Sequence, residues 1–165
     1  MYKYRILIFF LISIPVYSQD YKKLEVLDSI YKLRTLSKNN SLDISSKIIY
    51  AKKAIELSII STYDSTLLKS KRNLSFLYLR SGKISELKLI TSENYTLAET
   101  LKDSSAMANA DYILGYAYDE ESKYDSAYYH YFKAVKLYKS LKDNRKSAEV
   151  LMNMANIQET ERDYI

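Results

Sequence analysis

Few residues in this 165-residue chain could perform catalytic chemistry. It contains one histidine, His130, and no cysteine, which excludes thiolate zinc sites, disulfides and cysteine nucleophiles. A metal site or a general base would need a second ligand or a nucleophile beside that histidine, so we expect His130 to be an exposed helix residue. The acidic run at residues 119–121 is more typical of a solvated helix end than of a catalytic pair. The sequence therefore predicts no catalytic residue, no metal, no cofactor and no enzymatic activity.

Glycine and proline are too scarce for a phosphate-binding loop or a sheet protein. Gly82 and Gly115 are the only glycines, and their separation excludes the glycine-rich motifs that bind phosphates. Pro15 is the only proline, although loops between strands depend on these two residue types. With 47% hydrophobic and 27% charged residues, the composition is typical of a folded domain, and we expect an all-α fold. No run of five like charges occurs, so we expect no nucleic acid to bind this segment.

The first eighteen residues have the pattern of a secretory signal peptide. Lys3 and Arg5 precede a short apolar run, and small residues occupy positions −3 and −1 relative to a cut between Ser18 and Gln19. An uncleaved anchor or a buried first helix fits less well, because the apolar run is shorter than the ~20 residues of a membrane span. We therefore expect cleavage after Ser18 and a secreted or periplasmic protein.

Residue types recur at an offset of forty along the chain. The triplet Leu-Lys-Asp at 101–103 returns at 141–143, and Leu74 and Leu114 hold equivalent positions. A shared offset predicts a tandem array. Within each unit, apolar and small residues recur every three or four positions, which predicts two helices. The expected helices cover residues 20–37, 43–61, 64–81, 83–101, 104–121, 124–141 and 144–161.

Gly115 falls in the middle of one expected helix, where glycine costs about 1 kcal/mol relative to alanine. Close approach of the following helix would offset this cost. We expect Ala127 and Ala134 to be the small residues that face Gly115.

The third unit resembles the tetratricopeptide repeat. A Leu-Gly pair, three aromatic residues and two alanines occur in the order and spacing of that family, at Leu114, Gly115, Tyr118, Tyr124, Ala127, Tyr131 and Ala134. Ser122 stands at the corner where the family has glycine, and the period is 40 rather than 34, as in long-period bacterial members. The resemblance implies a right-handed α-solenoid of antiparallel helix pairs in one domain over 19–165. It implies about three and a half repeats, approximately 20–61, 64–101, 104–141 and a partial unit at 144–165.

In this family the first helix of each repeat lines a concave ligand-binding face. Carried onto this sequence, that rule predicts a groove formed by Lys69, Arg72, Phe76, Asn109, Tyr112, Tyr116, Asp119, Met152 and Asn156. Such a groove runs from basic through aromatic to acidic and suits an extended peptide of mixed charge. Tyr112 and Tyr116 are the expected anchors, because tyrosine combines contact area with a polar tip. The alternative is that these side chains are only the polar face of amphipathic helices.

The expected function is therefore an exported module for protein–protein or peptide interaction. One hypothesis makes it the periplasmic sensing segment of a larger signalling regulator, of histidine-kinase or helix-turn-helix type. That protein would continue past Ile165, and only then is a membrane expected as a partner. The alternative is a free-standing periplasmic scaffold without an output domain.

Overall fold

The structure is a computed structural model that describes residues 21–163, all helical apart from short connections and without a strand. The predicted signal peptide and cleavage site, and residues 164–165, lie outside the described residues. Residues 21–36 form the first helix. The helices that follow are α2 (Ile44–Ile60), α3 (Asp64–Arg80), α4 (Ile84–Thr100), α5 (Ser104–Asp119), α6 (Tyr124–Ser140) and α7 (Asn144–Asp163). Every boundary predicted among these residues agrees with the structure to within two positions.

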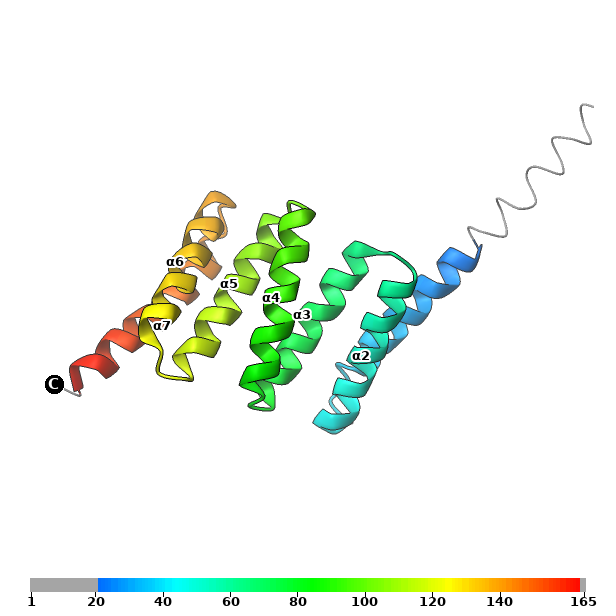
Figure 1. Ribbon diagram of the computed structural model, residues 1–165, viewed down its shortest axis with the longest axis horizontal. Helices are drawn as coiled ribbons and strands as arrows, with labels where there is room; N and C mark the ends of the chain where they lie inside the picture. The colour runs from blue at the N-terminus through cyan, green and yellow to red at the C-terminus, as the bar shows by residue number, and fades with distance from the viewer. Residues whose placement is uncertain (1–20, 164–165) are drawn as a thin grey trace, which may run out of the picture.

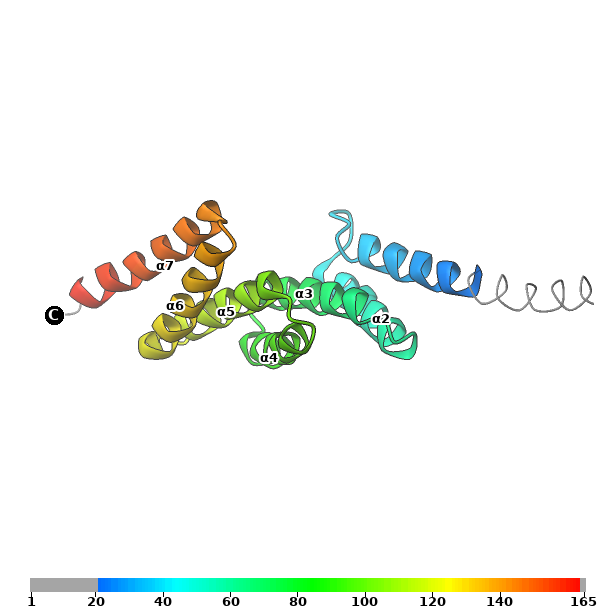
Figure 2. The same ribbon diagram turned by 90° about the horizontal axis from the view of Figure 1, so that it is seen from above.

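Successive helices pack against one another in series along the molecule (Figure 1). The backbones of two pairs of alternate helices also come close, α3 to α5 and α5 to α7, whereas those of α2, α4 and α6 do not approach one another. In Figure 2 the first helix and α7 rise on the side opposite to α4, so the array is curved. The first helix, α3, α5 and α7 line the hollow side of this curve, which we call the inner face.

Each helix start after the first helix lies forty residues from the next equivalent start. The starts of α2, α4 and α6 fall at Ile44, Ile84 and Tyr124, and those of α3, α5 and α7 fall at Asp64, Ser104 and Asn144. The offset read from the sequence is therefore the spacing of the helices themselves.

Sharp corners follow α2 to α6 at a spacing of twenty residues. One residue at each corner has a left-handed backbone, with φ between 55° and 66°; these residues are Thr62, Gly82, Lys102, Ser122 and Lys142. The next N–H donates to the carbonyl five residues earlier at 2.9–3.2 Å, and the left-handed residue donates three residues back at 2.8–3.2 Å. This pattern is the Schellman motif, which satisfies the last carbonyls of a helix. Only one of these corners has glycine, although L side chains rarely adopt this conformation.

The core consists of two apolar clusters that meet at α5. The first is built from α2 to α5 around Ile48, Leu77 and Leu87, and the second from α5 to α7 around Tyr131 and Tyr138. Among residues 21–163, no helix has both the length and the apolar character needed to cross a membrane.

Gly115 does lie at a close helix contact, but its partner is not the expected one. A Cβ atom on Gly115 would lie 2.6 Å from Cε1 and 2.9 Å from Cγ of Tyr131, closer than real Cβ atoms approach. Ala127 and Ala134, on the same helix as that ring, are fully buried. The nearest neighbour of Gly115 is therefore the Tyr131 ring and not one of the two expected alanines.

Candidate ligand-binding site

Two hollows adjoin each other on the inner face. The first, which we call the cationic hollow, has a volume of about 280 Å³ and is lined by Arg34, Lys38, Lys69, Arg72, Asn73 and Phe76. The second, the aromatic hollow, has a volume of about 170 Å³ and is lined by Arg72, Phe76, Asn109, Tyr112, Tyr138, Lys146, Glu149 and Val150. Both hollows share Arg72 and Phe76, which lie one turn apart on α3. A ligand that crosses from one hollow to the other must therefore pass these two side chains.

Arg72 and Phe76 form a contact of their own. The Arg72 guanidinium lies 6.0 Å from the centre of the Phe76 ring, at the outer limit of a cation–π interaction. Phe76 is 38% exposed and lines both hollows. Its ring is therefore available to a ligand.

The cationic hollow lies between the first helix and α3. Asn73 Nδ2 donates to Ser37 Oγ at 2.6 Å and so ties α3 to the residue that follows the first helix. Burial, and then the charge of Arg72, lower the pKa of Arg34. Burial also lowers the pKa of Lys38, with a smaller effect from the charges of Arg34 and Arg72. The fold thus holds several cations close enough to destabilise one another's charged forms.

Tyr112 forms one wall of the aromatic hollow and also connects two helices. Its hydroxyl donates to Glu149 Oε1 at 3.2 Å and accepts from Asn153 Nδ2 at 3.2 Å, both on α7. Its ring lies 6.1 Å from that of Tyr131, and burial raises the pKa of Tyr112. Tyr112 therefore contributes to the stability of the array, since its polar tip is already bonded within the protein.

Five of the nine residues predicted to form the groove line these two hollows: Lys69, Arg72, Phe76, Asn109 and Tyr112. The other four do not line them. Tyr116 is half-buried, and interaction with Glu120 raises its pKa to about 12. Asp119 accepts a long hydrogen bond of 3.5 Å from the Tyr131 hydroxyl, so it faces the neighbouring helix. Met152 and Asn156 are exposed on α7.

Arg34 and Lys38 are lining residues that the sequence analysis missed. The first helix lacks the repeat motif, so no groove position was assigned to it. A usable signal was nevertheless present. Two cations four residues apart, Arg34 on the first helix and Lys38 just after it, precede Lys69 and Arg72 on the next inner helix.

A second polar cluster surrounds Asp111, away from both hollows. Asp111 is fully buried, and its Oδ1 lies 2.9 Å from His130 Nδ1 and 3.2 Å from Lys133 Nζ. The His130 ring stacks on Tyr118, with ring centres 5.4 Å apart. The prediction that His130 is an exposed helix residue was therefore wrong, because its side chain is only 17% exposed.

The cluster joins three helices rather than presenting chemistry to a hollow. Lys133 Nζ, on α6, donates to the Tyr95 hydroxyl of α4 at 3.3 Å and lies 4.5 Å from the Tyr95 ring centre. Asp111 comes from α5. The cluster therefore combines a carboxylate of α5, an ammonium group of α6 and an aromatic ring of α4. Within residues 21–163 no group of three acidic or histidine side chains is arranged to hold a metal ion.

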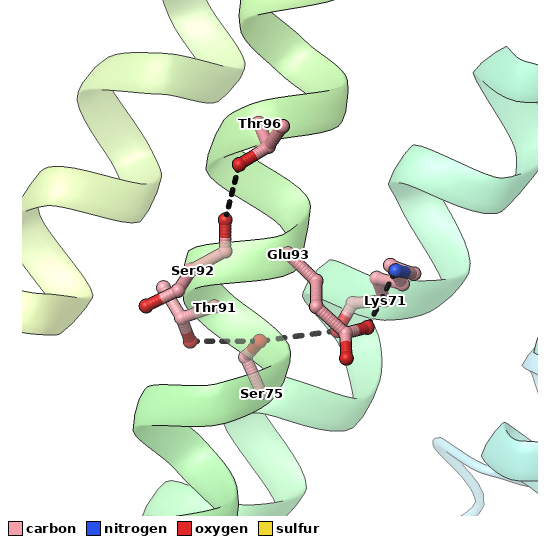
Figure 3. A network of polar contacts seen from close by, with 6 residues as sticks. All are labelled: Lys71, Ser75, Thr91, Ser92, Glu93 and Thr96. Atoms are coloured by element: carbon pink, nitrogen blue, oxygen red, sulfur yellow. Dashed lines mark hydrogen bonds and ion pairs between the residues drawn. The ribbon is translucent and has the colours of Figure 1, made fainter.

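The preceding helix pair has an ion pair at the equivalent place. Lys71 Nζ of α3 lies 2.7 Å from Glu93 Oε2 of α4, beside a hydrogen bond of 3.1 Å from Thr91 to Ser75 (Figure 3).

Comparison of the chain with protein-family models and with curated proteins gives no match.

Proposed function

We propose that this chain is a tetratricopeptide-like repeat protein that binds a protein or peptide on its inner face. On this proposal the array is right-handed and holds about three and a half repeats. The two hollows that meet at Arg72 and Phe76 carry the proposal, because they form one continuous line of polar and aromatic side chains across the first helix, α3, α5 and α7. Extended peptides bind in such lines through successive side-chain contacts.

The internal packing of the third unit supports the family assignment. Leu114, Gly115, Ala127, Tyr131 and Ala134 are all buried, as the motif requires of core positions. The ring of Tyr131 fills the space above Gly115, which gives the Leu-Gly pair a steric reason. Repeat proteins characteristically use the curvature of such stacks to form an extended binding surface.

The site also suggests the kind of contact that would dominate. Phe76 is an exposed aromatic between two hollows, and Arg72 can form paired hydrogen bonds to a carboxylate or a backbone carbonyl. Aromatic and arginine side chains carry most of the binding energy in protein interfaces. We therefore propose Phe76 and Arg72 as the anchors, in place of Tyr112 and Tyr116.

Peptide binding can be tested with the full chain and a displayed library of random peptides. Selected peptides are synthesised with a fluorophore, and their affinities for the native protein and two variants are compared by fluorescence anisotropy. We expect Phe76→Ala to weaken binding about tenfold or more, and Phe132→Ala, which removes an exposed ring from α6, to leave it within about twofold. Equal losses in both variants, or no peptide selected above background, would contradict the proposal.

We further propose that the protein is exported through residues 1–18, as a periplasmic scaffold or as the sensing segment of a signalling regulator. The basic start and short apolar run of that segment support export. The intact mass of the native product, immunopurified from its own cells, tests this. A product that lacks residues 1–18 supports the scaffold, a much heavier one supports the regulator, and an uncleaved 165-residue product contradicts export.

A further inference from the structure

The cationic hollow gathers four basic side chains around one space: Arg34, Lys38, Lys69 and Arg72. Six other basic side chains in residues 21–163 have a carboxylate within 4.0 Å: Lys32, Lys71, Lys88, Lys123, Lys133 and Lys146, and so does His130. None of the four cations of the hollow has such a partner among the described residues. Most other basic side chains in residues 21–163 also lack a close carboxylate, so what distinguishes the hollow is that two arginines and two lysines line the same space.

Arg34 shows most clearly that the hollow lacks a partner. Its Nε atom is buried and makes no hydrogen bond within the described structure. A buried donor without an acceptor normally costs free energy, and a charged one costs more. The burial and the nearby Arg72 charge that lower its pKa describe the same unfavourable position. Arg34 also lines the hollow together with Lys38, Lys69 and Arg72.

We propose that the cationic hollow binds a tetrahedral oxyanion with two negative charges, such as a phosphate or sulfate group. Two arginines and two lysines surround the space, and arginine offers paired donors to oxyanions while lysine acts as a point charge. A single carboxylate would leave most of this positive charge unbalanced, whereas a dianion balances more of it and offers more acceptor oxygens. This deepens the proposed function, since the hollow lies at one end of the same inner face, but it does not depend on peptide binding.

The size and lining of the hollow also bear on the source of the oxyanion. A volume of about 280 Å³ exceeds that of a single small anion, and Phe76 forms an apolar wall beside Arg72. The remaining space suits a ligand that carries the oxyanion on an apolar or aromatic group. A free inorganic ion would use the cations alone.

The test is a titration of the full chain with small anions, followed by two-dimensional NMR and isothermal calorimetry at constant ionic strength. Sodium phosphate, sulfate, phenyl phosphate and acetate are the probes. We expect saturable binding of phosphate and sulfate, with the largest chemical shift changes at residues of the cationic hollow, and binding of acetate at least about tenfold weaker. If phenyl phosphate binds more tightly than phosphate, the natural ligand carries its oxyanion on a larger organic group. If the two bind equally, the natural ligand is the free inorganic ion.

The variant Lys38→Gln/Lys69→Gln removes two exposed cations of the hollow without touching the core. The matched control is Lys52→Gln/Lys53→Gln, which removes two exposed lysines of α2 that line neither hollow. We expect the first variant to weaken phosphate binding about tenfold or more and the control to leave it within about twofold. Similar losses in both variants, acetate binding as tight as phosphate, or shifts that scale only with salt would overturn the proposal.

A failed peptide selection leaves this inference standing if phosphate still saturates the hollow. Phe76→Ala further separates the oxyanion site from the peptide site. This variant should weaken the binding of peptide and of phenyl phosphate, whereas the affinity for inorganic phosphate should not change. Peptide binding with no phosphate binding would reject the oxyanion site alone.

Discussion

The helix pairs α3–α4 and α5–α6 occupy equivalent places forty residues apart, yet different residues hold each pair together. In the first pair, small residues meet: Thr91 donates to the Ser75 hydroxyl at 3.1 Å, and Ser75 donates to the carbonyl of Lys71 at 3.1 Å (Figure 3). In the second pair the same positions hold Gly115 and Tyr131, and the ring lies directly on the glycine. The α3–α4 pair therefore packs two small side chains together, whereas the α5–α6 pair packs a large ring against a glycine.

The ion pairs at the next equivalent positions are reversed in sign. Lys71 of α3 pairs with Glu93 of α4, whereas Asp111 of α5 pairs with Lys133 of α6. Glu93 is 48% exposed, but Asp111 is completely buried. The two units therefore share the forty-residue spacing of their helices and the same pairing of positions, while the residue types at those positions differ together.

This difference teaches that the repeat is specified by complementary pairs. A residue at one position is explained by its partner across the helix interface, both in volume and in charge. Substitution of one member of a pair should lower the free energy of unfolding by far more than its residue type suggests. Substitution of both members should lower it by less than the sum of the two single substitutions.

The largest effect is expected when Tyr131 is replaced by the residue of the other pair. Tyr131→Thr should destabilise the protein by about 3 kcal/mol, because it removes a fully buried ring and leaves a cavity over Gly115. The free energy of unfolding in urea, followed by circular dichroism, measures this. Phe132→Thr, which replaces an exposed ring on the same helix, is the control and should change stability by less than about 0.5 kcal/mol.

Gly115→Leu should destabilise the native background by about 2 kcal/mol, since the new side chain must displace the Tyr131 ring. In the Tyr131→Thr background the ring is gone, so the same substitution should cost at least about 1 kcal/mol less. The measurement is a double-mutant cycle in urea. Strict additivity would show that the ring is not what excludes a side chain at position 115.

The helices and their period could be predicted because they depend on local spacing. Apolar residues every three or four positions and a common offset of forty locate each helix to within two residues. The presence of a close contact at Gly115 could be predicted as well, because glycine inside a helix needs a compensating reason. These features need no knowledge of which residues meet across an interface.

The partners across the interfaces could not be predicted in the same way. Asp111 and His130 lie 19 positions apart and meet only because α5 and α6 pack at a particular rotation. A lone histidine between tyrosines gave no sign of a buried carboxylate opposite it. The hollow at Arg34 was missed because the first helix lacks the repeat motif, although the spacing of the cations offered a signal.

The reversed ion pairs should differ in their contribution to stability. Asp111→Asn should destabilise the protein by about 1–2 kcal/mol, because His130 and Lys133 lose a buried carboxylate. Glu93→Gln should cost less than about 0.5 kcal/mol, since an ion pair this exposed is worth little. The free energy of unfolding in urea, measured for both variants at low and at high salt, compares the two ion pairs. Equal costs would mean that burial of Asp111 does not distinguish the two pairs.

The smallest effect concerns the corners that close the two helix pairs, Gly82 after α3 and Ser122 after α5. Both have a left-handed backbone, with φ of 66° and 56°, and a Cβ on Gly82 would meet nothing within 4 Å. Replacing glycine there adds strain alone, so Gly82→Ser should destabilise by about 1 kcal/mol. Ser122→Gly should stabilise by about 0.5 kcal/mol, because relief of strain exceeds the added entropy of the unfolded chain.

The neighbouring residue Ser81 is the control for whether a serine-to-glycine change stabilises or destabilises the protein. Its φ of −99° is ordinary for any side chain. Ser81→Gly should only destabilise, through unfolded-state entropy and the loss of the hydroxyl that donates to the Tyr78 carbonyl. If Ser122→Gly also destabilised, the corner after α5 would depend on its serine side chain and not on backbone freedom. The two helix pairs would then differ at their corners as they do at their interfaces, each fitted to its own residues.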